Sequence, residues 1–440
     1  MIISYIKMLL NLKVSNFRSF KEEINFSMIA SKDNTLEENL MTLNNLRLKK
    51  NAFIFGSNGS GKSNLVISLA FIQYMILNSK SFKVDREILE FPFKLDSKYR
   101  EEIPMSFEIN FLKSNKNYRY YFEIKNSKNK KFNFTILKER LFIDEKLEFE
   151  FISPNNKENK YANAKLKKDI EKRAELEKNE NMLLISYLYE KNYSHFDEFI
   201  EWFRHDLKVL VRYGRGVSMV SRINLASNFE DNELKSEVFN LLKNFSFDKI
   251  QNIKLDKVER SPPEFVKKMI LENDDLDEEE KFTQLEKIST KNKIFLSHMD
   301  NFNNEILFDL DKEESLGTNT LIKLLTLLVK TLKKNGVLVI DEIEDSIHPY
   351  LLKKVVDLIN EKENKIQLIA STHAYPLLLY VNSEEEQIFR RDQIYFTRLK
   401  EDQSTQLYSL MNIGGIRKDL KIFRAYFDGR LDAFPNIKNE

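Results

Sequence analysis

The alternation of hydrophobic and polar positions predicts strands in the first third of the chain. Residues 8–28 alternate as a pair of half-buried strands would, with a polar bend between them. An apolar run at 53–55 predicts a buried strand, and residues 65–76 have the pattern of a helix. Short alternating runs separated by polar turns then predict an antiparallel meander, at 106–111, 118–124 and 132–137.

The middle of the chain has mainly helical periodicity, and strands return after it. A solvated helix is expected at 166–176, and residues 181–210 continue as helix with an aromatic stripe that belongs in a core. Residues 229–300 are expected to be mostly helical. Apolar runs at 337–340 and within 365–378 predict two more buried strands. The pattern therefore indicates an α/β protein in three parts: an N-terminal lobe (1–150), a mainly helical insertion (151–300) and a C-terminal lobe (301–440).

Composition and charge narrow the function classes. The 440 residues include no Cys, which excludes disulfides and thiolate metal sites and fits a cytoplasmic protein. Lys and Arg number 70 against 68 Asp and Glu, so the net charge of +2 supplies no global attraction to nucleic acid. The apolar stretch at 1–10 is interrupted by Lys7 and predicts neither a signal peptide nor a membrane span.

A glycine-rich segment between the strand at 53–55 and the following helix has the pattern G-x-x-x-x-G-K-S. Such a loop turns backbone N–H groups toward phosphates, brings Lys62 to the β- and γ-phosphates, and offers the Ser63 hydroxyl to Mg²⁺. The predicted ligands are the loop residues Gly56, Ser57, Asn58, Gly59, Ser60, Gly61, Lys62, Ser63 and Asn64. Arg18, in the bend of the first strand pair, is either a solvated turn residue or a further nucleotide contact.

Two later strands end in residues suited to the chemistry of a nucleoside triphosphate. The run at 337–340 stops at Asp341 and Glu342, where Asp341 is predicted to hold Mg²⁺ and Glu342 to act as general base toward water. A buried strand before a surface turn would not explain two adjacent carboxylates there. The apolar strand within 365–378 ends in Ser371, Thr372 and His373. His373 is predicted to donate a hydrogen bond to the γ-phosphate.

A fourth segment, ESLGT at 314–318, precedes an apolar helix. By itself it is a helix N-cap with a glycine turn. In the order glycine-rich loop, ESLGT, acidic strand end and His373, it corresponds to the signature segment of an ABC-type ATPase. In that class Ser315 and Gly317 would contact the γ-phosphate held by a second copy, so that the catalytic site is complete only in a homodimer.

With these motifs the chain resembles the AAA15 family of ABC/SMC-like ATPases, a bacterial group close to the OLD-type and RecF/Rad50-type ATPases. The resemblance extends nearly from end to end, through MLLNLKVSNFRSF, FGSNGSGKSNL, FDKIQNI, ESLGT, VLVIDEIEDSIHP, STHA and RRDQIYF. It implies an ABC-type, RecA-like P-loop ATPase head that uses ATP and Mg²⁺. It also implies a part in anti-phage or abortive-infection systems. ESLGT departs from the LSGGQ signature, and no Gln stands out as the Q-loop residue.

Three functions follow from this sequence. The first is an ATP-dimerised ATPase that senses or regulates within an anti-phage system and controls a separate effector encoded nearby, a nuclease for example. The second is a nucleotide-gated scaffold with little turnover. The third is a RecF/SMC-like repair ATPase that binds nucleic acid, which the missing heptad repeats and the near-neutral charge disfavour.

Overall fold

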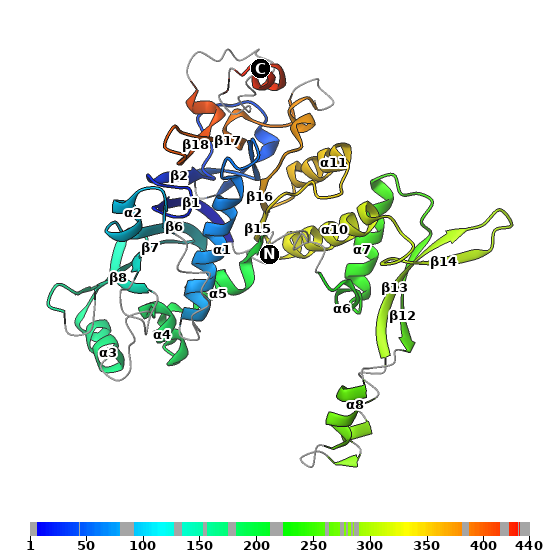
Figure 1. Cartoon of the computed structure of the whole chain (residues 1–440), viewed down its shortest axis with the longest axis horizontal. Helices are drawn as coiled ribbons and strands as arrows, with labels where there is room; N and C mark the ends of the chain where they lie inside the picture. The colour runs from blue at the N-terminus through cyan, green and yellow to red at the C-terminus, as the bar shows by residue number, and fades with distance from the viewer. Residues whose placement is uncertain are drawn as a thin grey trace. The chain divides into compact units, whose positions relative to one another are not determined.

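The computed structural model describes residues 7–43, 45–79, 92–126, 134–152, 156–174, 182–211, 223–259, 264–272, 277–278, 280–282, 285, 290–380, 387–413, 422–429 and 431. The chain forms two compact units. The first unit comprises Met1–Ser218, Thr331–Glu344 and His348–Glu440, and the second comprises Met219–Lys330 and Asp345–Ile347. Figure 1 shows their elements.

An antiparallel sheet forms one layer of the first unit. Within the described residues it has seven strands in the order β10-β9-β8-β7-β6-β1-β2. The predicted strand pair and meander are both confirmed as parts of this single sheet. The strands are β1 (Lys7–Ser15), β2 (Ile24–Ser27), β6 (Met105–Lys113), β7 (Lys116–Asn126), β8 (Phe134–Ile143), β9 (Lys146–Phe151) and β10 (Lys160–Tyr161).

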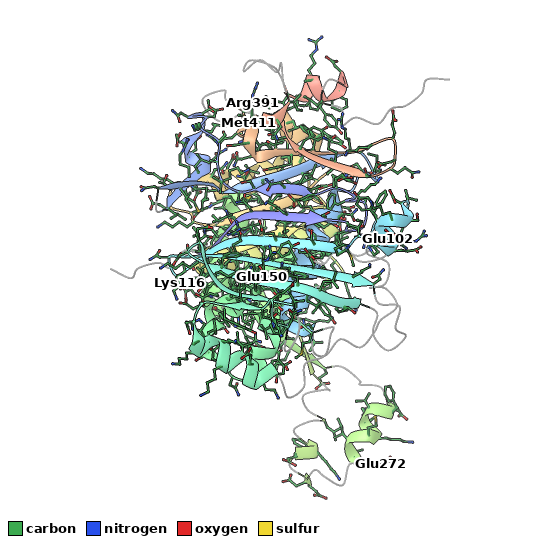
Figure 2. All side chains as sticks on the ribbon, turned by 90° about the vertical axis from the view of Figure 1, so that its left-hand side faces the viewer. Glu102, Lys116, Glu150, Glu272, Arg391 and Met411 are labelled. Carbon is green, nitrogen blue, oxygen red and sulfur yellow. The ribbon has the colours of Figure 1, made fainter. Side chains whose placement is uncertain are left out.

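The outer face of this sheet is charged. Figure 2 looks onto it, with Glu150 labelled. The Glu150 carboxylate pairs with the Lys138 ammonium at 3.1 Å and with the Arg140 guanidinium at 2.7 Å on the neighbouring strand. Along these strands, charged residues alternate with buried aromatic residues. This is the pattern of a sheet with one solvent-exposed face and one face packed against the core.

A second, mainly parallel sheet carries the predicted site. Its order in the described chain is β11-β15-β16-β5-β17-β18, with β18 antiparallel to β17 and the other neighbours parallel. The strands β5, β15 and β16 are fully buried, which explains their continuous apolar runs. The bounds are β5 (Asn51–Gly56), β11 (Leu207–Leu210), β15 (Val337–Ile340), β16 (Gln367–Ser371), β17 (Ile394–Leu399) and β18 (Thr405–Ser409).

One prediction for this sheet is wrong. Residues 181–210 were expected to be helical throughout, yet Leu207–Leu210 is the strand β11, parallel to β15. Leu207 and Leu210 are both buried and are spaced as on a helix, so the local pattern did not separate the two structures. Pairing with a strand far along the chain decided the outcome.

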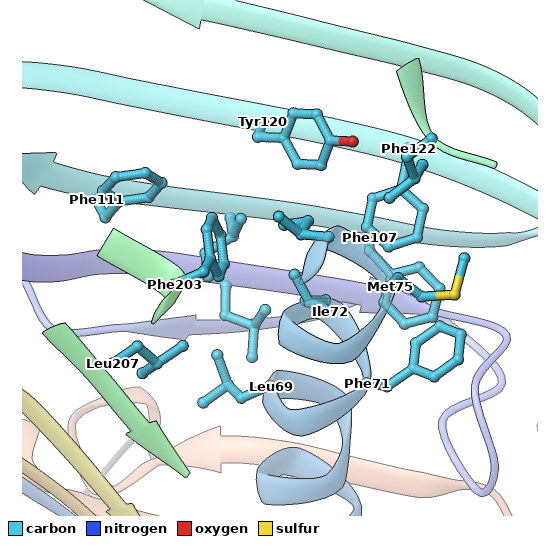
Figure 3. Close-up of a cluster of buried hydrophobic side chains, with 14 of the residues drawn as sticks. Leu69, Phe71, Ile72, Met75, Phe107, Phe111, Tyr120, Phe122, Phe203 and Leu207 are labelled. Carbon is cyan, nitrogen blue, oxygen red and sulfur yellow. The ribbon is translucent and has the colours of Figure 1, made fainter. Parts of the chain in front are cut away.

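Helix α1 (Lys62–Asn78) lies between the two sheets and has buried residues on more than one face. Figure 3 shows Ile72 and Met75 of this helix toward the aromatic rings of β6 and β7, and Leu69 on the side of Leu207. The Phe107 and Phe122 rings stack with centroids 4.9 Å apart. Burying each such side chain contributes about 1.5–3 kcal/mol, so the helix that begins at the glycine-rich loop is firmly anchored.

Shorter elements complete the first unit. The predicted solvated helix at 166–176 is confirmed as α3, which begins and ends two residues earlier. The helices are α2 (Ser97–Glu101), α3 (Ala164–Ala174), α4 (Leu184–Glu190), α5 (Asp197–Glu201), α11 (Pro349–Asn360) and α12 (Ile422–Phe427), with a π-helical turn η5 (Trp202–Asp206). A small sheet pairs β3 (Leu40–Leu43) with β4 (Leu46–Lys49), and 3₁₀ turns occupy Glu37–Asn39, Ser194–Phe196, Tyr375–Leu378, Arg391–Gln393 and Leu410–Asn412.

The second unit combines an antiparallel sheet with helices. Residues 229–300 were predicted to be mostly helical, which is wrong for β12 and β13. Ile253 and Leu296 face each other on these strands and are buried, but the surrounding residues are largely charged and hide the alternation. The elements are α6 (Leu225–Asn228), α7 (Asn232–Asn244), β12 (Asn252–Glu259), α8 (Glu264–Leu271), β13 (Thr290–Met299), β14 (Glu305–Asp309) and α10 (Leu316–Lys334). The last turn of α10, from Thr331, belongs to the first unit.

The predicted α/β fold class with an antiparallel meander is therefore confirmed. The three-part division of the chain stays a prediction. Within the described residues, no helix has the length and apolar character needed to cross a membrane.

Candidate functional site

Three neighbouring parallel strands bring the predicted residues together. Strand β16 lies between β15 and β5, so the ends that precede Asp341, His373 and the glycine-rich loop are adjacent. Hydrogen bonds join these ends, from the Ile343 N–H to the Ser371 carbonyl at 3.1 Å and from the Thr372 N–H to the Ile54 carbonyl at 3.0 Å. The carboxyl edge of a parallel sheet is where such folds bind ligands.

In the glycine-rich loop, residues 56–64, glycine is required at different positions for different physical reasons. A Cβ added to Gly56 would lie 2.5 Å from the Thr397 hydroxyl, and one added to Gly61 would overlap the Thr405 hydroxyl. Gly61 also has φ +98°, as N-cap of α1. Gly59 has φ +76°, but a Cβ there would meet open space. Close packing thus demands glycine at 56 and 61, whereas at 59 only the backbone conformation favours it.

Hydroxyl groups of neighbouring elements form hydrogen bonds that hold the loop in place. The Ser60 and Thr397 hydroxyls are 2.6 Å apart, and the Thr405 hydroxyl donates to the Ser60 carbonyl at 2.9 Å. Ser19 contacts the Thr405 hydroxyl at 2.7 Å, so the bend between β1 and β2 reaches the loop. Sequence reasoning missed Thr397 and Thr405, because nothing in the β17–β18 hairpin sequence marks them as partners of the loop.

Arg18 lies in the same bend, directly before Ser19. It is exposed and has φ +54°, a left-handed conformation uncommon for a residue with a side chain. The bend is thus next to the loop, and a contact between Arg18 and the nucleotide stays a prediction.

Lys62 is buried at the start of α1. Its ammonium donates to the carbonyls of Gly56 at 2.8 Å and Ser57 at 3.0 Å. Burial lowers its pKa to about 8, although the charges of Glu344 and Asp341 oppose this shift. The ammonium is therefore held at the loop, in a place poorly solvated by water.

Ser371 links the two predicted acids. Its hydroxyl donates to Asp341 Oδ1 at 2.5 Å and accepts the Glu342 N–H at 2.8 Å. Glu342 has φ +51°, so the chain turns sharply where the strand stops. Such backbone conformations cluster at functional sites. A single buried hydroxyl thus fixes both the orientation of Asp341 and the turn that presents Glu342.

His373 and Glu344 form a further contact at this edge. The His373 N–H donates to Glu344 Oε1 at 2.6 Å. Burial, helped by the Lys62 charge, lowers the His373 pKa to about 4, so the imidazole is neutral at pH 7. Sequence reasoning missed Glu344. Its only signal is that it is a third acid following β15.

Ser315 and Gly317 lie in the second unit, at the N-terminus of α10. The Ser315 hydroxyl accepts the Thr318 N–H at 3.0 Å, which confirms the N-cap interpretation. A Cβ on Gly317 would lie 2.7 Å from the Ser346 carbonyl, so close backbone approach requires glycine there. Both residues thus have local structural roles, and their contact with the nucleotide of a second copy stays a prediction.

A glycine-rich loop between a buried parallel strand and a helix, with an acidic strand end beside it, defines a P-loop NTPase. The family model described as "AAA domain, putative AbiEii toxin, Type IV TA system" matches residues 52–379, and the chain belongs to this family. The match contains the glycine-rich loop, Asp341, Glu342 and His373. It confirms the P-loop ATPase class that the motifs predict. No curated protein sequence matches the chain.

Solved structures of SMC heads are similar to the chain at low identity. One is the SMC head bound to the C-winged helix domain of ScpA, with 14% identity, a TM-score of 0.42, and coverage of 91% of this chain and 97% of that chain. Another is the SMC head domain from Thermotoga maritima, with 13% identity, a TM-score of 0.41, and coverage of 91% and 98%.

Proposed function

We propose that the chain is a Mg²⁺-dependent ATPase that acts in the cytoplasm as an ATP-bridged homodimer. The observation that supports it most is the meeting of Lys62, Asp341, Glu342 and His373 at the ends of three adjacent parallel strands. These residues come from opposite ends of the chain. A structural role alone would not require a cation, two carboxylates and a neutral imidazole at one sheet edge.

The donor set at this edge fits Mg²⁺. The ion prefers hard oxygen ligands, and the Ser63 hydroxyl and the Asp341 carboxylate are of that kind. Asp341 is buried and oriented by the Ser371 hydroxyl, as a ligand should be. When bound, Mg²⁺ would neutralise charge on the phosphate oxygens.

The chain's own groups supply the remaining chemistry. Lys62 and the N–H groups of the loop neutralise the β- and γ-phosphates, and the neutral His373 donates a hydrogen bond to the γ-phosphate. Glu342 accepts the proton of the water whose oxygen attacks the γ-phosphorus, and the bond from that phosphorus to the bridging oxygen of ADP breaks. Ser315 and Gly317 of a second copy would complete the site.

The test of this mechanism is Glu342→Gln. We expect kcat to fall on the order of a hundredfold or more while ATP still binds, because the amide cannot accept the proton. Phosphate release and ATP binding by calorimetry measure the two effects. Glu363→Gln, an exposed carboxylate in the loop between α11 and β16, is the matched control. A Glu342→Gln protein with the normal turnover rate would show that another group is the base.

We further propose that ATP turnover regulates a separate effector in an anti-phage or abortive-infection system. The family description, which names a toxin and a type IV TA system, supports this setting. An effector, for example a nuclease, is expected to be encoded nearby. Co-purification with the product of an adjacent gene tests the idea, and an ATPase that stays without a partner in infected cells contradicts it.

Two alternatives give different results in the same assays. If the chain is a nucleotide-gated scaffold, the wild-type protein would bind both the effector and ATP but release almost no phosphate. A repair ATPase would bind DNA with an affinity that falls steeply as salt rises. With a net charge of +2, such binding would need a local basic patch.

A further inference from the structure

Glu344 is a carboxylate that the mechanism above leaves unused. Oε1 accepts the His373 N–H at 2.6 Å. Oε2 is buried and has no hydrogen-bond partner among the residues that the structure describes. Buried polar atoms in folded proteins almost always have partners, and an exception calls for a ligand or a bound water.

The charged surroundings of Glu344 are those of the phosphate site. Its negative charge raises the pKa of Lys62 more strongly than the charge of Asp341 does. Burial raises the pKa of Glu344 itself. Hydrogen bonds with the Thr372 side chain and the His373 N–H oppose this shift, and the Lys62 charge opposes it more weakly. The Glu344 charge also raises the pKa of Tyr375, after the larger effect of burial. Glu344 thus acts on the lysine that is predicted to meet the β- and γ-phosphates.

The backbone that leads into Glu344 is fixed by Ser371 of β16. Ile343, the preceding residue, is buried, and its N–H donates to the Ser371 carbonyl at 3.1 Å. Glu342, one residue earlier, donates its N–H to the Ser371 hydroxyl. With its own Oε1 bonded to the backbone of His373, the Glu344 carboxylate has little freedom to turn away from the site.

We propose that Glu344 is a second carboxylate of the nucleotide site, in which Oε1 fixes the backbone at His373 and Oε2 accepts a hydrogen bond from a water that arrives with the triphosphate. The inference rests on the proposed ATPase function and adds a positioning residue to it. Glu342 remains the group that takes the proton, and Glu344 orients the water and the imidazole.

Glu344→Gln separates these two tasks. The glutamine keeps an oxygen for the His373 N–H but replaces the other oxygen by an NH₂ group, which cannot accept a hydrogen bond. We expect kcat to fall about tenfold or more through lost orientation. ATP should bind several-fold more tightly, because a negative charge near Lys62 and the phosphates is removed. Glu344→Ala also loses the contact with His373, so its kcat should fall further.

The readouts are kcat, and the Kd for ATP measured by calorimetry, with Glu363→Gln as the control. A Glu344→Gln protein with wild-type kcat and losses confined to Glu344→Ala would reduce Glu344 to a support of His373 and overturn the proposal. If the wild-type chain hydrolyses no ATP, the proposed function fails, and the affinity comparison alone decides the role of Glu344. Tighter ATP binding by Glu344→Gln then supports a place in the nucleotide site, and unchanged binding overturns it.

Discussion

At the scale of the residue, the burial of Lys62 couples nucleotide binding to pH. An ammonium group with an ordinary pKa stays charged up to about pH 10. The Lys62 ammonium, desolvated at the loop, has a pKa of about 8. Below pH 8 it carries the positive charge that attracts the triphosphate, and above pH 8 the free protein loses that charge.

We therefore expect the Kd for ATP to rise above pH 8, approaching a limit of about tenfold per pH unit. Bound phosphate favours the charged form and shifts the Lys62 pKa upward, so the slope persists until that higher value. Calorimetric titration of Glu342→Gln with ATP from pH 7 to 9.5 measures the effect without turnover. Adding Lys62→Met should weaken binding and remove the slope, and a slope that survives this change would assign it to another group.

Also at the residue scale, the sequence predicted those site residues that stand in contiguous motifs. Lys62 stands in the glycine-rich pattern, and Asp341 and Glu342 directly follow an apolar run, so their neighbours mark all three. Glu344, Thr397 and Thr405 could not be found in this way. Their roles exist only because β16, β17 and β18 lie beside strands that are distant in the sequence. The hydroxyl of Ser371 likewise gains two partners only when β15 and β16 are adjacent.

At the scale of the element, the glycine-rich loop depends on its contact with the β17–β18 hairpin. Gly61→Ala would force a methyl group against the Thr405 hydroxyl in a left-handed backbone. We expect a loss of about 1–3 kcal/mol in the free energy of unfolding, as for overpacked sites, together with weaker ATP binding. Gly59→Ala is the matched control, where only the backbone conformation resists and the loss should be about 1 kcal/mol.

Chemical denaturation of the two alanine variants measures this difference. Equal losses would mean that the hairpin does not press on the loop and that the backbone conformation alone requires glycine at both positions.

Strand prediction succeeded or failed for a physical reason at this same scale. Wholly buried strands such as β5 and β15 are continuous apolar runs and were predicted correctly. Strand β12 is largely exposed or half-buried, so its sequence shows little alternation. Strand β11 follows Trp202 and Phe203, whose helical spacing extends into it. In both failures the partner strand, and not the local sequence, determines the structure.

At the scale of the whole molecule, the proposed dimer can be tested by mixing two inactive variants. Leu316→Glu changes an exposed residue at the N-terminus of α10. A carboxylate at a helix N-terminus is favoured by the helix dipole, so the helix should stay folded. Its negative charge would, however, repel the γ-phosphate of ATP bound to the other copy. Mixed with Lys62→Ala, it should form heterodimers with one intact site. Random pairing then restores about a quarter of wild-type turnover.

Lys62→Ala mixed with Glu342→Gln is the control. Both changes affect residues that the proposed mechanism places in the same half of the site. Every heterodimer therefore lacks an intact site, and turnover should stay at the background rate. If the first mixture stays as inactive as the second, ESLGT does not act in trans.

Tyr375 connects the glycine-rich loop to helix α12 near the C-terminus. This connection matters for the preparation of shortened or tagged forms of the protein. Its hydroxyl donates to the Gly56 carbonyl at 2.8 Å, the same oxygen that accepts the Lys62 ammonium. Its ring stacks on Tyr426 of α12 with centroids 4.5 Å apart. A deletion that removes α12, or a fusion that displaces it, would uncover this ring and loosen the first residue of the glycine-rich loop. A handle placed there for purification is thus expected to alter nucleotide affinity.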